Sequence, residues 1–251
     1  MPTVLIVSSL VAASPVGGAA QAALLGRMGL ETMLVPTVLF GRHPGLGAPG
    51  GGPVAASVLA DMLEAIAATD SRPEAVLAGY FAGPDQVGAA AFAIDLAKRS
   101  AALAIVDPIM GDLEHGLYVA EATAAAVIDV LAPRADLLCP NAWELGRMVG
   151  AAVTDLSSAR RATDRLASAA LVSSIPLGDD IGVLLTDGGG SWLARHRRVA
   201  TLARGAGDRL TAGFLGHRLL GASAPEALTA AVEDVAAWVA GRPLPVVVDS
   251  L

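Results

Sequence analysis

The chain has 251 residues, of which 54% are hydrophobic and only 4% aromatic, and its formal net charge is −7 at pH 7. This length suits one large α/β domain, whereas the acidic balance excludes a nucleic-acid binder, because no basic stripe could neutralise successive phosphates. The single cysteine, Cys139, excludes an internal disulfide, and no window is apolar for the length that a membrane helix needs. The start, MPTVLIVSSL, lacks the basic flank of a signal peptide, so we expect a cytoplasmic protein with no membrane partner.

The first half of the chain alternates short apolar segments with helical ones. Strands are expected at residues 3–8, 31–39, 75–77 and 101–106, and helices at 17–28, 53–68 and 84–99. Pro53 is expected in the first turn of its helix, where a missing N–H is tolerated. Such alternation implies right-handed crossovers and a mainly parallel sheet with helices on both faces, a three-layer α/β/α fold.

The second half continues this pattern less regularly. Helices are expected at 121–131, 142–149, 155–169, 208–220 and 224–240, and strands at 136–139, 171–175 and 181–186, with a hairpin at 191–203. No repeat or linker divides the chain, so a single domain over residues 1–251 is expected. The glycine-rich stretch HPGLGAPGGGP, residues 43–53, is expected to be a mobile loop that can act as a lid.

A glycine-rich turn precedes the helix expected near the end of the chain, in RGAGDRLTAGFLGHRLLG, residues 204–221. The backbone N–H groups of Gly205, Ala206 and Gly207 would face an anion at the helix N-terminus without interference from bulky side chains. A carboxylate beside an anion repels it, so Asp208 makes chemical sense as the base that deprotonates an attacking hydroxyl. The simpler alternative is that Asp208 only caps the helix.

Three more polar residues stand where expected strands end or helices begin. Asp107 follows a strand, at a position where a carboxylate can hold Mg²⁺ near phosphates. Asn141 and Glu144 are one helical turn apart and can face one ligand, with Asn141 binding phosphate and Glu144 a metal-bound water. Asn141 and Glu144 also fit a capping box, and Asp107 fits an ordinary turn before proline.

Together these segments resemble the ribokinase superfamily. Gly-Ala-Gly-Asp resembles its signature, and DPIMG at 107–111 and PNAWEL at 140–145 resemble elements of its vitamin kinases. VLLTDG at 183–188 resembles its Val-x-Val-Thr-x-Gly strand beside the nucleotide, which implies that Thr186 and Gly188 bind ATP. The resemblance covers nearly the whole chain. It implies a ribokinase-like fold, ATP as phosphoryl donor, Mg²⁺ held near Asp107 and Glu144 partly through water, and room for a monovalent cation such as K⁺.

The substrate half of the chain resembles pyridoxal kinases most. VSSLVA at 7–12, FGRHPGLG at 40–47 and LAGY at 77–80 are similar to their substrate segments. The resemblance implies that a small heteroaromatic alcohol is held by Ser9, His43, Gly45 and Tyr80, and that pyridoxal is phosphorylated on its 5′-hydroxymethyl group. His43 and Tyr80 are also compatible with a solvated loop histidine and a core tyrosine. Relatives of this kind are commonly homodimers, so a homodimer is expected.

Several positions depart from the pyridoxal kinase pattern. Leu10 replaces a histidine, Ala13–Pro15 replace Tyr-Gly-His, and Pro44 replaces a threonine. SPVGGAAQAAL at 14–24 is similar to a segment of hydroxymethylpyrimidine kinases, which makes thiamine precursor phosphorylation the second candidate. A non-catalytic protein that binds a B6 vitamer is the third. The preferred vitamer and nucleotide are left open by the sequence.

Overall fold

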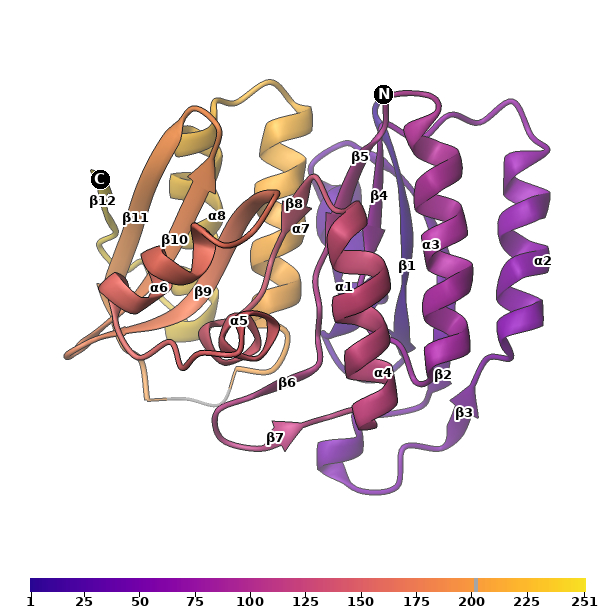
Figure 1. The fold of residues 1–251 in the computed structure, drawn as a ribbon, viewed down its shortest axis with the longest axis horizontal. Helices are drawn as coiled ribbons and strands as arrows, with labels where there is room; N and C mark the ends of the chain where they lie inside the picture. The colour runs from indigo at the N-terminus through magenta and orange to yellow at the C-terminus, as the bar shows by residue number, and fades with distance from the viewer. Residues whose placement is uncertain (201–202) are drawn as a thin grey trace.

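The strands of the computed structural model, which describes residues 1–200 and 203–251, form one large sheet with helices on both faces (Figure 1). Ten strands lie in the order β12-β11-β10-β9-β8-β5-β4-β1-β2-β3. The expected three-layer α/β/α architecture with a mainly parallel sheet is confirmed. The strands of this sheet are β1 (Thr3–Val11), β2 (Glu31–Phe40), β3 (Gly51–Pro53), β4 (Ala75–Ala78), β5 (Leu103–Val106), β8 (Leu137–Leu138), β9 (Ala169–Leu177), β10 (Asp180–Asp187), β11 (Gly190–Arg197) and β12 (Val247–Ser250).

The six strands from β2 to β9 in this order run parallel to one another, and β3, β10, β11 and β12 join at the two ends in antiparallel pairs. β1 explains the long apolar run at the start of the chain. Val4 and Ile6 contact the core on one face of the sheet, and Leu5 and Val7 contact the core on the other. A strand covered on both faces needs apolar residues at every position, as in other parallel sheets.

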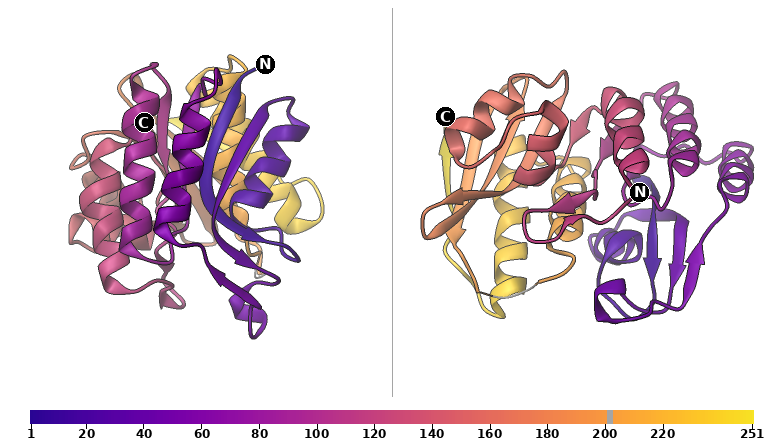
Figure 2. Two further views of the ribbon diagram at one scale, coloured as in Figure 1. Left: turned by 90° about the vertical axis from the view of Figure 1, so that its right-hand side faces the viewer. Right: turned by 60° about the horizontal axis from the view of Figure 1, so that its bottom comes forward.

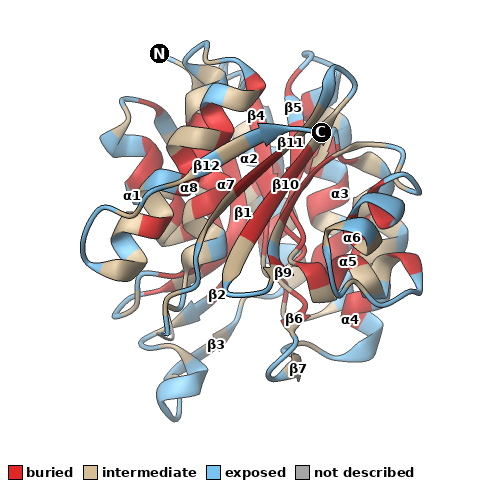
Figure 3. Cartoon of the chain, turned by 90° about the vertical axis from the view of Figure 1, so that its left-hand side faces the viewer, coloured by how far each residue is buried: buried red, intermediate tan, exposed pale blue. Residues whose placement is uncertain are grey.

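The helices divide between the two faces. α1, α7 and α8 pack on the face that carries Val4 and Ile6, whereas α2, α3 and α4 cover the opposite face and α5 and α6 continue that layer over β9 and β10 (Figures 1 and 2). Figure 3 shows the buried strands between these two helical layers. The bounds are α1 (Gly17–Arg27), α2 (Ala56–Ala67), α3 (Pro84–Lys98), α4 (Glu121–Ala126), α5 (Ala142–Val149), α6 (Leu156–Thr163), α7 (Ala206–Leu219) and α8 (Ala224–Ala240).

The expected helix at 53–68 begins later than the sequence suggested. Pro53 belongs to β3, where it pairs with Val38 of β2, and α2 starts at Ala56. A proline is tolerated in such an edge strand because no further strand needs its N–H. The glycine-rich stretch 43–53 is also more ordered than expected, since it contains the 3₁₀ turn Pro44–Leu46 as well as β3.

Other boundaries moved because strands took residues from expected helices or loops. The expected helix at 155–169 ends at Thr163, since β9 begins at Ala169 and pairs there with Leu137 of β8. The expected hairpin at 191–203 is a single strand, β11, whose partner is β10, and residues 201 and 202 lie outside the described part of the chain. The helix expected at 121–131 is α4 followed by a π-helical turn, Val127–Leu131.

Two small features were not expected at all. β12 adds a strand beyond β11, and β6 (Gly111–Asp112) pairs with β7 (Gly116–Leu117) in a separate two-stranded sheet. β6 and β7 follow β5 and lie at the same end of the molecule as the start of α7, the lower end in Figure 1. The carboxyl ends of the parallel strands therefore meet the N-terminus of α7, the usual place for a ligand in such sheets.

Candidate active site

The turn before α7 depends on a glycine. Gly205 is the N-cap of α7 and has a φ of 89°, and a Cβ at this position would lie 2.1 Å from the carbonyl oxygen of Pro15. Gly207 has no atom within 4 Å of its Cβ position. α7 begins at Ala206, two residues earlier than expected. The N–H groups of this first turn have no partner within the helix, as an anion site requires.

Asp208 has one anchored oxygen and one free one. Its Oδ2 accepts a hydrogen bond of 2.9 Å from the backbone N–H of Gly17 at the start of α1. Its Oδ1 is shielded from solvent and has no hydrogen-bond partner among the described residues, although the residue as a whole is only half-buried. Burial raises the pKa of Asp208 to about 6, even though the Gly17 N–H acts in the opposite direction. The carboxyl group is therefore oriented and able to take up a proton.

Gly17 connects Asp208 to the expected substrate side of the site. Its φ is 66°, and a Cβ on Gly17 would lie 1.9 Å from the Oγ of Ser9. Ser9 is 6% exposed at the end of β1. The structure therefore brings Ser9 and Asp208 next to the same glycine, although they are far apart in the sequence.

Asp107 is held from the same helix as Asp208. It follows β5, is 5% exposed, and its Oδ2 accepts a 2.9 Å hydrogen bond from the hydroxyl of Thr211, one turn after Asp208 in α7. Burial raises the pKa of Asp107 well above its usual value, and the charges of Asp208 and Glu144 raise it further. Three carboxyl groups thus share one end of the sheet.

Asn141 and Glu144 form the capping box that was the alternative reading of these residues. The Asn141 side chain accepts from the N–H of Glu144, and Glu144 Oε2 accepts from the N–H of Asn141, both at 2.9 Å. Glu144 Oε1 also accepts from the N–H groups of Met110 (2.7 Å) and Gly111 (3.3 Å), after Asp107. Burial raises the pKa of Glu144 to about 7 despite these bonds. Glu144 therefore takes part in the cap of α5 and also lies close to Asp107.

The donor set at this end of the sheet suits a hard cation only if other ligands complete it. No group of three or more His, Cys, Asp or Glu side chains within metal-binding reach occurs among the described residues. Asp107 and Glu144 are two buried oxygen donors whose pKa values are raised chiefly by burial, and for Asp107 also by the charges of Asp208 and Glu144. Mg²⁺ is commonly held by one or two carboxylates together with substrate phosphates and water, so these residues fit it.

The stretch 43–47 lies close to the Asp208 turn. His43 caps the 3₁₀ turn, and its Nδ1 accepts a 3.0 Å hydrogen bond from the N–H of Gly45. The backbone N–H of His43 donates to the hydroxyl of Ser14 at 3.3 Å. Partial burial and the charge of Arg204 lower the pKa of His43. The ring is therefore neutral near pH 7, with Nε2 left for a ligand.

Tyr80 is anchored through its backbone. Its N–H donates to the Oγ of Ser8 at 3.2 Å, and its carbonyl accepts from the hydroxyl of Thr37 at 2.7 Å. The side chain is half-buried, and burial raises the pKa of its hydroxyl. Tyr80 therefore keeps a protonated hydroxyl at the end of β4, next to β1.

Thr186 and Gly188 are not brought to this site. β9 runs parallel to β8, and β10 runs antiparallel to β9, so that Thr186 pairs with Ala170 near the start of β9. Gly188 belongs to the turn between β10 and β11. In Figure 1 this turn lies at the upper edge of the sheet, whereas α7 starts at the lower edge. The prediction that these two residues bind ATP beside Asp208 is therefore wrong, because the motif lies on an antiparallel strand.

Sequence reasoning missed several contributors. Gly17 and Thr211 hold the two key carboxylates, but neither contact is visible without the fold. Ser173, in the middle of β9, forms a β-bridge with Asn141, and Ser174 beside it has a φ of 62°. Arg204 lies beside Gly45. A sequence signal existed only for Arg204, which directly precedes the glycine-rich turn.

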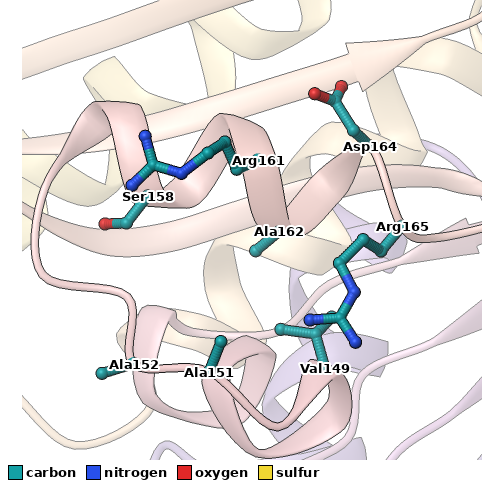
Figure 4. Close-up of a pocket in the computed structure, with 8 residues that line it drawn as sticks. All are labelled: Val149, Ala151, Ala152, Ser158, Arg161, Ala162, Asp164 and Arg165. Atoms are coloured by element: carbon teal, nitrogen blue, oxygen red, sulfur yellow. The ribbon is translucent and has the colours of Figure 1, made fainter.

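A surface hollow of about 450 Å³ lies elsewhere, between α5 and α6 (Figure 4). It is lined by small residues and two arginines, and none of its residues belongs to the site described above. The lining residues are Val149, Ala151, Ala152, Ser158, Arg161, Ala162, Asp164 and Arg165.

Comparison with known proteins shows the family of this chain. Residues 25–245 match the family model described as phosphomethylpyrimidine kinase. A pyridoxine/pyridoxal/pyridoxamine kinase from Bordetella avium is 34% identical over 90% of this chain and 81% of its own length. A pyridoxal kinase PdxY from Deinococcus radiodurans is 33% identical over 90% of this chain and 82% of its own length. The chain is thus a member of a small-molecule kinase class. It belongs to the phosphomethylpyrimidine kinase family, which includes these pyridoxal kinases.

Solved structures share the fold. Pyridoxal kinase from Entamoeba histolytica has a TM-score of 0.92 at 22% identity, with complete coverage of both chains. Pyridoxal kinase from Staphylococcus aureus, in complex with AMP-PCP and pyridoxal, has a TM-score of 0.83 at 18% identity and covers 100% of this chain and 99% of its own. Within the described residues, no helix combines the length and apolar character required to span a membrane.

Proposed function

We propose that this protein is an ATP-dependent kinase that phosphorylates the 5′-hydroxymethyl group of pyridoxal and so forms pyridoxal 5′-phosphate. One observation carries the proposal: Asp208 has one carboxyl oxygen fixed by the Gly17 N–H, and the other is shielded and has no partner among the residues that the structure describes, directly at the glycine-rich start of α7. The names of the relatives support pyridoxal as the acceptor.

Asp208 and the turn before it have separate roles in the proposed reaction. Oδ1 of Asp208 accepts the proton of the hydroxymethyl group, and the freed alcohol oxygen attacks the terminal phosphorus of ATP. The N–H groups of Gly205, Ala206 and Gly207 stabilise the negative charge on the transferring phosphoryl group. The bond to the ADP oxygen breaks and ADP leaves.

Asp107, Asn141 and Glu144 form the nucleotide side of the site. Asp107 and Glu144 would hold Mg²⁺ through phosphate oxygens and water. The amide of Asn141, which donates to the carbonyl of Gly111 at 2.8 Å, would exchange this partner for a phosphate oxygen. Bound Mg²⁺ offsets the charge of the phosphates. We also propose that activity requires a monovalent cation such as K⁺.

Ser9, His43, Gly45 and Tyr80 form the substrate side. Ser9 and Tyr80 offer hydroxyl groups to a ring nitrogen or oxygen, and the Nε2 of His43 offers a further polar contact. The stretch 43–53, with five glycines, closes over the ring and keeps water from the phosphoryl group. We also propose a homodimer, as sheet edges leave strand groups available for pairing.

Hydroxymethylpyrimidine is the second candidate acceptor. The description of the matching family model, phosphomethylpyrimidine kinase, favours it. The departures at Leu10, Ala13–Pro15 and Pro44 lie on the substrate side, and they bear on the choice of ring rather than on phosphoryl transfer.

The test is to incubate the protein with Mg-ATP and each of pyridoxal, pyridoxine, pyridoxamine and hydroxymethylpyrimidine, with and without K⁺. We expect pyridoxal 5′-phosphate as the product formed with the highest kcat/KM. A preference for hydroxymethylpyrimidine would select the second candidate. Vitamer binding without any phosphorylated product would identify a non-catalytic binding protein and overturn the proposal.

A further inference from the structure

Arg204 lies between two parts of the proposed site. It directly precedes Gly205, and its side chain is exposed. Its Nε is 3.5 Å from the position that a Cβ of Gly45 would occupy. The side chain of Arg204 therefore lies beside the stretch 43–47, which belongs to the proposed substrate side, and its backbone directly precedes the amides of the glycine-rich turn.

The proposed phosphate site near Arg204 contains several carboxylates. Asp107, Glu144 and Asp208 all lie at the end of the sheet where a polyphosphate must bind, and each lowers the affinity for an anion by repulsion. Among the described residues, no carboxylate lies within 4.0 Å of a side-chain nitrogen of Arg204. Its five N–H donors are therefore available, in the planar arrangement that suits phosphate oxygens.

We propose that Arg204 binds the phosphoryl group that is transferred to the substrate, and that it holds this group as the phosphate of the product. This inference rests on the proposed function and adds a phosphate-recognising side chain to the backbone amides of the turn. Contact with Gly45 couples this role to the stretch 43–47, since a guanidinium beside Gly45 reaches a phosphate on the ring that this stretch covers. A Cβ at position 45 would be in van der Waals contact with the Arg204 Nε, so the side chain of Arg204 lies directly against this glycine.

The test compares the affinities for pyridoxine and pyridoxine 5′-phosphate in Arg204→Gln, Arg204→Lys and the wild type. These ligands have no aldehyde and so form no Schiff base with Lys98 or the N-terminus. Arg204→Gln should weaken binding of the phosphorylated ligand about 10-fold to 100-fold, the effect of a lost charge-assisted hydrogen bond, and change pyridoxine binding less than about twofold. Arg204→Lys should lose less, because it keeps the charge. Arg160→Gln in α6, exposed and outside the site, controls for the change in net charge.

The results separate this inference from the kinase proposal. An equal loss for both ligands, an unchanged affinity for pyridoxine 5′-phosphate, or a wild type that does not prefer it would overturn the role of Arg204, whatever the turnover. If the wild type phosphorylates no vitamer, the kinase proposal fails. If Arg204→Gln then still weakens binding of the phosphorylated ligand alone, the role of Arg204 in phosphate binding is supported. Arg204 is exposed, so its replacement leaves the core intact, and a thermal melt of each variant verifies this.

Discussion

Asp208 is the residue on which turnover should depend most. Asp208→Asn keeps the shape of the side chain and an oxygen for the Gly17 N–H, but it removes the group that takes up the proton. We expect kcat to fall by roughly two to four orders of magnitude, the usual contribution of a general base, while the Kd for ATP stays within a few-fold. Asp187→Asn, in the turn at the opposite edge of the sheet, should leave kcat unchanged. A kcat near the wild-type value in Asp208→Asn would exclude Asp208 as the base.

The pH dependence of activity should report the same residue. The pKa of Asp208 is raised to about 6 by burial, and a general base acts only in its deprotonated form. The value of kcat/KM should therefore fall about tenfold per pH unit below pH 6 and level off above it. The residual rate of Asp208→Asn should lack this inflection. An inflection that persists unchanged in the variant would assign it to the substrate or to another residue.

The same carboxyl group should reduce stability. Its pKa is about 6 in the folded protein against the ordinary 3.8, so between these values the folded state binds more protons than the unfolded state. The free energy of unfolding therefore falls as the pH rises from about 4 to 6, and the loss is complete above 6. Asp208→Asn should thus be more stable than the wild type by on the order of 2 kcal/mol at pH 7.5, and by much less at pH 4. Urea titrations at both pH values measure this difference, and a difference that is the same at both would contradict the assignment.

Individual site residues were predictable where a motif carried them. Asp107, Asn141, Glu144 and Asp208 stand at strand ends and helix starts, positions that alternating patterns and capping rules locate from sequence. Their partners were not predictable, since the N–H of Gly17 and the carboxylate of Asp208 are separated by most of the chain. A hydrogen bond of this kind depends on how α1 and α7 pack, which no local pattern encodes.

At the level of elements, the two glycines before Asp208 should behave differently. An alanine at 205 needs a φ of 89° and would place its Cβ 2.1 Å from the carbonyl oxygen of Pro15, whereas one at 207 meets no atom within 4 Å. Gly205→Ala should destabilise the protein by about 1–3 kcal/mol, and Gly207→Ala should leave stability equal or slightly higher.

Activity should separate the two variants further. If phosphate approaches the backbone at 207, Gly207→Ala should fold normally and still lose at least about tenfold in kcat/KM, since its methyl group stands where the ligand passes. Melting temperatures and steady-state kinetics of both variants provide the measurement. A fully active Gly207→Ala would show that the phosphoryl group does not approach the backbone at this glycine.

Helices and strands were predicted well where a local sequence pattern determines them, and poorly where the pairing of strands determines them. The helix at 84–99 agrees with α3 to within one residue at its end. Pro53 looked like a helix start, but pairing with Val38 places it in β3. The sequence around Thr186 resembled a nucleotide-binding strand. However, β10 runs antiparallel to its neighbour β9, so Thr186 lies at the edge of the sheet opposite the candidate site. The residues of a strand do not by themselves determine whether it runs parallel or antiparallel to its neighbour.

At the scale of the whole molecule, one sheet joins both halves of the chain. β8 pairs with β5 from the first half and with β9 from the second, so the sheet is continuous across the halves, and the core beneath α1, α7 and α8 contains residues from both. Alternating strands and helices predicted the parallel centre of this sheet, since crossovers leave few other arrangements. The antiparallel end from β10 to β12 was not predicted, because β12 is a short C-terminal segment with no helix before it to signal a crossover.

This continuity predicts a single cooperative unfolding transition. A chain in which the sheet spans both halves has no boundary at which one half can unfold alone, so the calorimetric and van't Hoff enthalpies should agree. AMP-PCP with Mg²⁺ at about 100 times its Kd should add about 2.7 kcal/mol to the free energy of unfolding and shift the whole transition upward by roughly 5–10 °C. Differential scanning calorimetry with and without the nucleotide tests both statements. Two transitions, of which only one moves with AMP-PCP, would mean that the sheet separates into two units and that the nucleotide contacts one of them.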